Sequence, residues 1–459
     1  MRRDMKRSAS VLIAAISLLM ATCSIAATRP RYGGTLRIAV QAAPTSLDPT
    51  DSIQLDSITR SNLLRLIFDT LVDLDDRGTI QPAIATSWEP EPGNQRWHFN
   101  LRPGITFSDG TPLNSNGAAA SLRTANPSWR VFATGDALVI ECDSPNPFLP
   151  VELTLPRNGI VKRESGKLVG SGPFAISHLD AGKKLELSVR DDYWRGRAFL
   201  DSIEIELGRN FREQMIELDL GKADVVEVAP EQAHRAAAEG RSVKNSVPIE
   251  LMALVFSRDP QTADDARQRQ VLALSIDRVS MNSVLLQGDA QATGALLPGW
   301  MTGYSFLFPG EADLSRARQL RGEIRYAPSW SLGYDASDPL ARLVAERITL
   351  HGRDAGLSVQ LSNSSTADLR LIRIPLASLD PVLAFTNLAG ALKAPQPKVT
   401  GNAPSDLYAA EVLLLETKRV MPLLYLRTTT AAASSVQNWT VGPGGNWRPQ
   451  DVWLATEKP

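Results

Sequence analysis

The sequence predicts a mixed α/β protein with more than one domain. Several segments alternate strictly between apolar and polar residues, which is typical of strands that bury one face and expose the other. Other segments carry apolar residues at helical spacing. The chain has 459 residues, whereas a single hydrophobic core rarely serves more than about 250–300 residues. We therefore expect at least two cores.

The strand pattern is clearest in four segments: residues 35–40, 96–101, 184–189 and 202–207. In the last of these, Ile203 and Ile205 occupy one face of the expected strand. Glu204 and Glu206 occupy the other face. Such strands suit sheets with one solvated face rather than a parallel sheet that is covered on both sides.

Residues 98–122 combine several turn signals within one short stretch. Pro103-Gly104 and Asp109-Gly110 are strong turn pairs, and Asn114 is a favourable N-cap for the alanine-rich helix that follows. Each signal agrees with a single path of strand, turn, strand, turn and helix. The stretch therefore specifies a scaffold, and we assign it no catalytic role.

Three longer segments predict helices: residues 269–286, 338–356 and 405–419. The second has Asp338 as its N-cap and Pro339 at its first position, and Gly356 ends it before a further strand. The third is expected to begin after Ser405 and to end in Lys418-Arg419, whose charges complement the helix dipole.

The first 26 residues have the features of a secretory signal peptide. A basic start is followed by an apolar run over 11–21, which is too short to span a bilayer, and by small residues up to Ala26. We expect cleavage near Ala26 and a periplasmic mature protein. Cys23 raises the alternative of a lipid anchor, but Met20 and Thr22 are not the residues expected before a lipidated cysteine.

Charge and cysteine content narrow the possible functions. Removing residues 1–26 deletes four basic residues and Asp4, which leaves 45 Lys and Arg against 49 Asp and Glu. Such a mildly acidic chain lacks the basic surface of a nucleic-acid-binding protein. Cys142 then has no partner for an internal disulfide, and its place in the alternating ALVIECD segment predicts a core residue rather than a reactive thiol.

The sequence contains no familiar catalytic or metal-binding motif. The four histidines, at positions 98, 178, 234 and 351, are not at ligand spacing from one another. Ser171 lies in Gly-Ser-Gly-Pro, which predicts a turn before a strand and lacks the pattern of a nucleophile elbow. We expect neither an enzyme nor a bound metal or other cofactor. The alternative is an exported hydrolase that uses Ser171 with a distant histidine.

Nine blocks of the sequence, in order, resemble those of family 5 of the extracellular solute-binding proteins, the peptide- and nickel-binding receptors of ABC transporters. They cover nearly the whole mature chain. The blocks are GGTLRIAVQAAPTSLDP (33–49), IFDTLVDLDDRGTIQPAIATSWEP (67–90), the stretch 98–122, GSGPFAI (170–176), RDDYWRGRAFLDSIEIEL (190–207), GKADVV (221–226), LALSIDR (272–278), DPLARLVAERI (338–348) and VMPLLYL (420–426).

This resemblance implies an α/β, two-lobed periplasmic-binding-protein fold (type II, cluster C-like) with a reduced extra subdomain in the first lobe. It also implies a monomer that delivers a peptide or similar small solute to ABC transporter permease subunits. The expected divisions are a signal peptide (1–26), lobe I (27–250, with the subdomain at roughly 75–165), lobe II (251–425) and a C-terminal return to lobe I (426–459).

The chain departs from the family at positions that bear on the ligand. The long insertion expected between Leu122 and Cys142 is missing, which is why the subdomain is predicted to be reduced. The family's pocket block often carries an aromatic residue after glycine and then an Asp that pairs with a peptide amine. Those positions fall at Ile374 and Ala377 here, with Asp380 nearby as the residue before Pro381. A degenerate paralogue that acts as a sensor or scaffold without transport is therefore an alternative.

The expected ligand site lies between the lobes and is mostly apolar. This lining favours a neutral or partly apolar solute, or a peptide held through its backbone, over a metal ion. Trp300 and Tyr304 stand in a loop-like stretch rich in Gly and Pro, where they either line the cleft or pack the second lobe. The candidate ligand-binding residues are Pro44, Thr45, Ser46, Met252, Leu254, Trp300, Tyr304, Ile374, Ala377 and Asp380.

Overall fold

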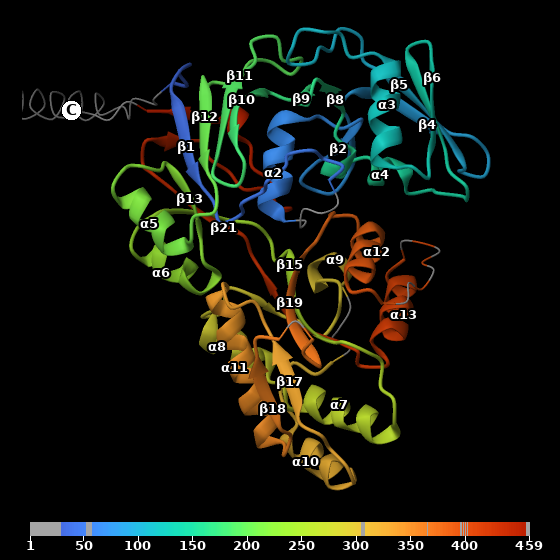
Figure 1. Ribbon diagram of the computed structural model, residues 1–459, viewed down its shortest axis with the longest axis vertical. Helices are drawn as coiled ribbons and strands as arrows, with labels where there is room; N and C mark the ends of the chain where they lie inside the picture. The colour runs from blue at the N-terminus through green and yellow to red at the C-terminus, as the bar shows by residue number, and fades with distance from the viewer. Residues whose placement is uncertain are drawn as a thin grey trace, which may run out of the picture.

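The computed structural model describes residues 29–51, 57–303, 308–364, 366–394, 397, 399, 401 and 403–455. Its described strands form two large sheets and several smaller ones (Figure 1). The seven-stranded sheet and a four-stranded sheet lie in the upper part of the view, and the six-stranded sheet lies below them. We name the part built around the seven-stranded sheet lobe I, the part built around the six-stranded sheet lobe II, and the part built around the four-stranded sheet the subdomain.

The lobe I sheet is mixed, because β1 runs parallel to both β12 and β13 whereas the other pairs are antiparallel. Ile203 and Ile205 are fully buried, as the alternating pattern predicted. The strands, in spatial order, are β10 (Phe174–Asp180), β11 (Lys184–Val189), β12 (Ser202–Glu206), β1 (Thr35–Ala39), β13 (Val225–Val228), β21 (Thr429–Ala432) and β14 (Ser242–Asn245).

The subdomain packs the helix α3 (Ser115–Ala125) against an antiparallel sheet. Asn114 caps α3 by accepting a hydrogen bond from the Gly117 amide, which confirms the predicted helix start. After α3 the chain passes directly into a hairpin of the sheet, and Cys142 is buried at the end of this hairpin. The sheet consists of β4 (Ala85–Pro90), β5 (Arg96–Leu101), β7 (Ala137–Glu141) and β6 (Arg130–Thr134), in that order.

The lobe II sheet has its antiparallel strands on one side and its parallel strands on the other. Central strand β15 pairs antiparallel with β19 and β20, whereas β17 pairs parallel with β18 and β19. The strands, in spatial order, are β16 (Gln291–Ala292), β20 (Val420–Leu426), β15 (Glu250–Phe256), β19 (Leu369–Pro375), β17 (Trp330–Gly333) and β18 (Val359–Ser362).

Helices cover both large sheets, and short hairpins complete the fold. In Figure 1, α2 lies between the lobe I sheet and the subdomain, and α7, α10 and α11 surround the lower end of lobe II. The helices are α2 (Ile58–Ile67), α4 (Leu149–Glu152), α5 (Phe211–Asp219), α6 (Ala233–Ala238), α7 (Ala263–Ser275), α8 (Arg278–Leu285), α9 (Gly299–Thr302), α10 (Leu314–Gly322), α11 (Pro339–Asp354), α12 (Pro381–Ala391) and α13 (Pro404–Leu415). The hairpins are β2 (Val72–Leu74) with β3 (Ile80–Pro82), β8 (Val161–Glu164) with β9 (Lys167–Gly170), and β22 (Val436–Gln437) with β23 (Trp453–Leu454).

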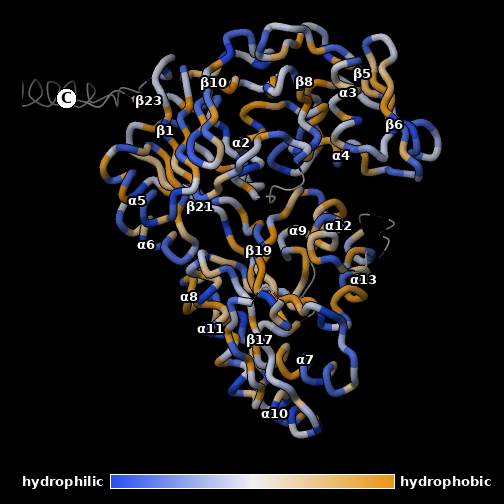
Figure 2. Tube along the Cα trace, viewed as in Figure 1, coloured by the Kyte–Doolittle hydropathy of each residue, from blue (hydrophilic) through white to orange (hydrophobic). Residues whose placement is uncertain are grey.

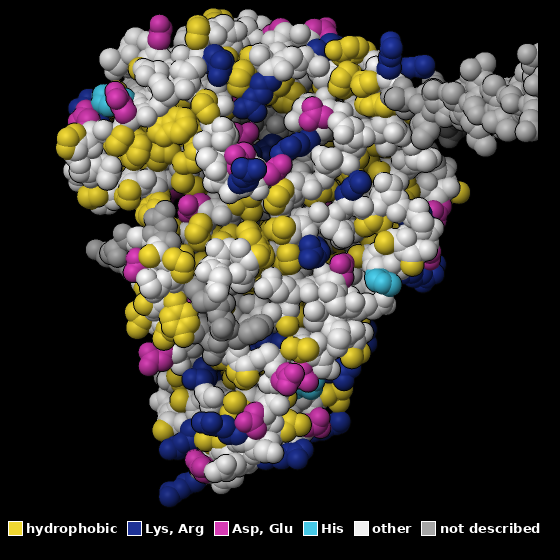
Figure 3. Space-filling model, turned by 180° about the vertical axis from the view of Figure 1, so that it is seen from behind, with side chains coloured by type: hydrophobic (Ala, Val, Ile, Leu, Met, Phe, Trp, Pro, Cys, Tyr) yellow, Lys and Arg dark blue, Asp and Glu magenta, His cyan; other side chains and the backbone are white. Residues whose placement is uncertain are grey.

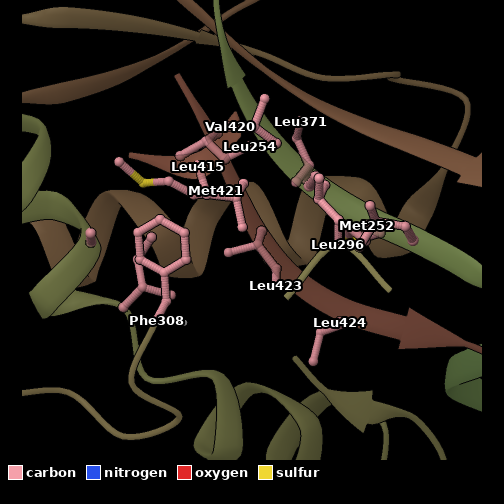
Figure 4. Close-up of a cluster of buried hydrophobic side chains, with 14 of the residues drawn as sticks. Met252, Leu254, Leu296, Phe308, Leu371, Leu415, Val420, Met421, Leu423 and Leu424 are labelled. Carbon is pink, nitrogen blue, oxygen red and sulfur yellow. The ribbon is translucent and has the colours of Figure 1, made fainter. Parts of the chain in front are cut away.

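Hydrophobic residues follow the central strands and the packed helices. Figure 2 shows them along β19 and in α12 and α13. In lobe II they form one large core, part of which is drawn in Figure 4 with Met252, Leu254 and Leu424 among its members. Lobe I and the subdomain have separate clusters. The expectation of more than one hydrophobic core is thus met.

Two short crossing segments, 246–249 and 427–428, connect the two large sheets. They are hydrogen-bonded to each other, because the Ser246 amide donates to the Thr428 carbonyl at 3.0 Å and the Thr428 amide donates to Ser246 Oγ at 3.0 Å. The Ile249 amide continues the pairing to Leu426 at 2.9 Å. The lobes therefore meet at a joined pair of strand extensions.

Two of the three predicted helices differ from the structure. The predicted helix 269–286 is two helices, because Ile276 has extended backbone and Asp277 caps α8 by accepting from the Ser280 amide. The third helix starts at Pro404 rather than after Ser405, has no side-chain cap, and ends at Leu415. The second is confirmed in full, with Asp338 as N-cap and Gly356 at a φ of 81° behind its end.

Candidate ligand-binding site

A hollow of about 560 Å³ lies beside the crossing segments. The first segment contributes Val247 and Pro248 to its wall, and the second contributes Arg427. Lobe II supplies the other lining residues, which come from α8, β16 with the residue before it, and α9. They are Asn282, Ala290, Gln291, Ala292 and Trp300. The site thus joins the part of the chain that connects the lobes to one edge of the lobe II sheet.

Trp300 is the aromatic residue of this hollow. It stands in α9, and its indole N–H donates to the Pro248 carbonyl at 3.0 Å. The hydrogen bond fixes the ring against the crossing segment, yet 42% of the residue stays exposed. An exposed indole held in place by its own N–H offers its face to a bound molecule. On the side of the molecule seen in Figure 3, hydrophobic side chains also gather between the upper and lower parts.

Arg427 is the charged residue of the hollow. Its Nε donates to the Asp289 carbonyl at 3.2 Å and its Nη1 to the Ser246 carbonyl at 2.9 Å. Both acceptors are neutral backbone groups, so they orient the guanidinium without cancelling its charge. Among the described residues, no carboxylate oxygen forms an ion pair with Arg427 within 4.0 Å.

Arg373, on β19, is held in the opposite way. It forms ion pairs with Glu250, at the start of β15, and with Asp338, the N-cap of α11. Burial opposes the charge of Arg373, but the two carboxylates outweigh this effect and raise its pKa. By the predicted alignment this arginine occupies the place of the family's glycine, one residue before Ile374. Two acidic partners already satisfy it, so it has little charge left for a ligand.

The predicted residues of lobe I lie in the loop that follows β1. Pro44 is buried and its carbonyl accepts from the Gly182 amide, whereas Thr45 is exposed. Ser46 Oγ accepts from the Asp48 amide at 3.1 Å. These contacts form the turn, and none of the three residues is part of the hollow's lining.

The predicted residues of lobe II are dispersed. Met252 and Leu254 are 0% exposed and belong to the core (Figure 4), so we do not carry them into the proposed site. Ile374 packs partly against that core, and Ala377 is exposed. Asp380 is the N-cap of α12 and accepts from the Leu383 amide at 2.9 Å, which agrees with its interpretation as the residue before Pro381. Tyr304 lies outside the described residues.

Of the residues that line the hollow, the candidates predicted from the sequence include Trp300 but neither Arg427 nor Pro248. A signal for Arg427 was present, because it is a charged residue directly after the all-apolar block VMPLLYL (420–426). All seven residues of the corresponding strand are buried. The first charge after such a strand marks the point where the chain leaves a core.

Apolar contacts also join lobe II to the subdomain. Leu383 of α12 is buried with Val151 and Leu155 of the subdomain. The preceding Leu379 lies against the turn at Gly78, since a Cβ atom placed there would be 3.5 Å from that of Leu379. Leu379, in the loop before α12, and Leu383, in the first turn of α12, therefore pack against the subdomain.

Ser171, the nucleophile of the alternative hydrolase hypothesis, is 0% exposed. Its Oγ accepts from the Asp69 amide at 3.3 Å. The flanking Gly170 and Gly172 lie against the backbone of Ile67 in α2, where a Cβ atom on Gly170 would be 1.9 Å from the carbonyl oxygen. The Gly-Ser-Gly segment is therefore explained by close packing on a helix end.

A two-sheet α/β protein with paired crossing segments and a hollow beside them has the architecture of a bilobal binding protein. Residues 79–373, more than half of the chain, match the sequence profile of "Bacterial extracellular solute-binding proteins, family 5 Middle". The chain belongs to this family and is a solute-binding receptor. No helix in the described part is long and apolar enough to cross a membrane.

Relatives and solved structures agree with this assignment. The chain is 24% identical over 421 residues to the periplasmic murein peptide-binding protein MppA of Escherichia coli, with 78% of this chain and 77% of MppA covered. It is 30% identical over 204 residues to the uncharacterized protein YhjP of Bacillus subtilis, covering 41% of this chain and 34% of YhjP.

The structural comparison confirms the predicted two-lobed fold. The crystal structure of NikA from Staphylococcus aureus in complex with Ni(L-His)2 matches with a TM-score of 0.77 at 17% identity, covering 92% of this chain and 100% of NikA. The structure of Escherichia coli MppA also gives 0.77, at 18% identity, covering 92% of this chain and 99% of MppA.

Proposed function

We propose that the protein captures a peptide or similar small organic solute beside the crossing segments and delivers it to an ABC importer. The single observation that carries this proposal is the hollow that both crossing segments and Trp300 line. A solute bound there would contact the connection between the lobes directly, so its binding would bias their relative position. MppA, a relative over most of the chain, is named as a murein peptide-binding protein, which supports a peptide-like solute.

The proposal includes the division of the chain and its export. Lobe I would be residues 27–250 with the subdomain at roughly 75–165, lobe II residues 251–425, and the return 426–459. The membership of the strands supports this, because the lobe II sheet uses only β15 to β20. Residues 1–26 would direct export to the periplasm and be removed, and the receptor would act as a monomer.

The protein would have no catalytic activity of its own. The complete burial of Ser171 supports this, since a nucleophile needs access to its substrate. Purified wild type should hydrolyse neither ester nor peptide substrates above the background rate. Turnover that Ser171→Ala abolishes would contradict this part of the proposal.

A thermal-shift screen of dipeptides, oligopeptides, neutral sugars and Ni²⁺ tests solute capture. A ligand at 100 times its Kd stabilises the folded protein by about 2.7 kcal/mol, so at least one peptide should raise the Tm by a few degrees. Trp300→Ala should reduce that shift, whereas Tyr326→Ala, which changes an exposed aromatic residue outside the hollow, should leave it unchanged. Stabilisation by Ni²⁺ alone, lost on substitution of histidines, would contradict an organic solute.

A further inference from the structure

We infer that the hollow selects solutes that carry a carboxylate or similar anionic group on a flat or apolar body. This inference rests on the proposed function, because it names the class of solute that the same hollow would take. It depends on three features of the lining: the guanidinium of Arg427, the indole of Trp300, and the apolar residues Val247, Pro248 and Ala292.

Arg427 is an anion-binding group already in position. Two backbone carbonyls orient its guanidinium, at 3.2 Å from Nε and 2.9 Å from Nη1. Nη2 has no hydrogen-bond acceptor among the described residues. A planar guanidinium with free N–H groups binds a carboxylate with defined geometry, and such charge-assisted hydrogen bonds are stronger than neutral ones.

The nearest acidic residue does not neutralise Arg427. Asp289 gives it a backbone carbonyl, but the Asp289 carboxylate is beyond the 4.0 Å limit of an ion pair. Burial raises the pKa of Asp289, and the positive charge of Arg427 only partly opposes this rise. A ligand carboxylate in the hollow would therefore be a closer partner for Arg427 than Asp289 is.

Arg373, on β19 of the lobe II sheet, is an arginine whose charge is already satisfied. Its Nη1 lies 2.8 Å from Asp338, and its other side is bound by Glu250. A solute carboxylate would have to compete with both of these groups. The contrast makes Arg427, rather than Arg373, the selective group for an anion.

The rest of the lining favours a flat or apolar body next to that anion. Trp300 exposes its ring at one wall, and Val247, Pro248 and Ala292 add further apolar surface. The Asn282 side chain is already used, since its amide and carbonyl groups bond the backbone of Ala290 at 2.8 and 3.1 Å. The hollow thus places one cation beside an aromatic face and contributes few other polar groups.

The test compares two probes that differ in one terminal group, the carboxylate of N-acetyl-L-phenylalanine and the neutral carboxamide of N-acetyl-L-phenylalaninamide. Calorimetric titration of the full-length protein should give a Kd for the acid at least about tenfold lower than for the amide, as a charge-assisted contact requires. Arg427→Gln should weaken acid binding until the two Kd values agree, and should leave the amide unchanged.

Three further variants sharpen the test. Arg342→Gln, which removes an exposed charge on α11, should leave both Kd values unchanged. Asp289→Asn removes a negative charge near Arg427 and should lower the Kd for N-acetyl-L-phenylalanine a few-fold. This result does not require the Arg427→Gln variant to fold. Trp300→Ala should weaken the acid and the amide by the same factor.

Equal Kd values for the two probes in the wild type would overturn the inference, as would acid binding that Arg427→Gln does not change. Failure of the wild type to bind either probe would overturn it too. Each of these results leaves the proposed function standing if a peptide or another organic solute of the thermal-shift screen still binds. A screen in which no organic solute binds would contradict the proposed function itself.

Discussion

Burial shifts the pKa of side chains of opposite charge at two positions in each lobe. Lobe I has two acidic side chains in desolvated positions, Asp69 at the end of α2 and Glu227 on β13, and burial raises the pKa of each. Lobe II buries two cations instead, Arg269 of α7 and Arg278 of α8, and burial lowers the pKa of each. Of these four residues, only the two acids have ordinary pKa values near pH 4. A pH change between 4 and 7 should therefore affect these acids of lobe I and leave the charges of the two arginines of lobe II unchanged.

Hydrogen bonds make both kinds of buried charge tolerable. Asp69 accepts from Tyr193 Oη at 3.0 Å and from Trp194 Nε1 at 2.9 Å, so it ties the RDDYW segment to the end of α2. Arg278 donates to the carbonyls of Pro422, Ile276 and Pro309, and its guanidinium lies 5.4 Å from the ring centre of Phe308. Asp69 and Arg278 thus each act as a connector, a buried charged residue whose hydrogen bonds join separate segments of one lobe.

The largest effect is expected from Arg278→Ala. The change leaves a cavity and removes the donor from the carbonyls of Ile276 and Pro422, which are buried, and of Pro309, which is exposed. Together these losses should cost about 4 kcal/mol of unfolding free energy. Arg278→Met, which restores much of the volume, should lose about half as much. Denaturant unfolding measures both, and wild-type stability of the alanine variant would show that Arg278 is not a connector.

Gly170→Ala tests the contact between the Gly-Ser-Gly segment and α2 in lobe I. The new Cβ atom would meet the Ile67 carbonyl oxygen at 1.9 Å, so the segment must move away from the helix. We expect the unfolding free energy to fall by about 3 kcal/mol, which is at the upper end of the range for overpacked substitutions. Gly322→Ala in lobe II is the matched control, since nothing lies within 4 Å of its Cβ position. Equal effects of the two changes would contradict the packing argument.

Asp69→Asn tests the difference in pH response. Burial raises the pKa of Asp69 to about 6, although Trp194, Arg195 and Tyr193 oppose the rise. The folded state therefore binds a proton that the unfolded state lacks between about pH 4 and pH 6, and stability falls as pH rises through this window. Between about pH 4 and pH 6, the unfolding free energy of the wild type should fall by about 2 kcal/mol relative to that of Asp69→Asn. A constant difference in unfolding free energy from pH 4.5 to 7.5 would refute this.

The smallest effect should come from Asp48→Asn. The pKa of Asp48 is lowered, whereas that of Asp69 is raised. Despite the opposing effect of burial, Arg163 and Thr50 lower the pKa of Asp48 to about 2. Its contribution to stability is therefore present above pH 4 and is lost as pH falls toward 2. Because Asp48 and Arg163 are both partly exposed, we expect Asp48→Asn to lower the unfolding free energy by less than about 1 kcal/mol at pH 7. A loss of unfolding free energy well above about 1 kcal/mol at pH 7, or one that does not shrink as pH falls toward 2, would contradict this prediction.

Local signals allowed most of the fold to be predicted from the sequence. Asn114 and Asp338 cap helices at the positions predicted from the local sequence, because capping involves only three or four residues. The break at Asp277 was missed because the apolar spacing continues across it and masks the cap. Ordered blocks predicted the two lobes, since the family pattern covers nearly the whole mature chain.

The site was harder to predict because it depends on segments far apart in the chain. Trp300 was identified as an aromatic residue in a loop-like stretch. Arg427 gains its role only where the Ser246 and Asp289 carbonyls orient it, and no local pattern brings these three residues together. Met252 and Leu254 were candidate ligand-binding residues, but the strand that carries them turns these side chains into the core.

Hydrogen–deuterium exchange, with and without the solute that best stabilises the protein, tests the central claim most directly. If a solute binds beside the crossing segments, amide exchange should slow in residues 246–250, 426–429 and 299–303. Exchange in α10 (Leu314–Gly322), at the far end of lobe II, should stay unchanged (Figure 1). Slower exchange confined to other regions, with none at the crossing segments, would contradict the proposed site.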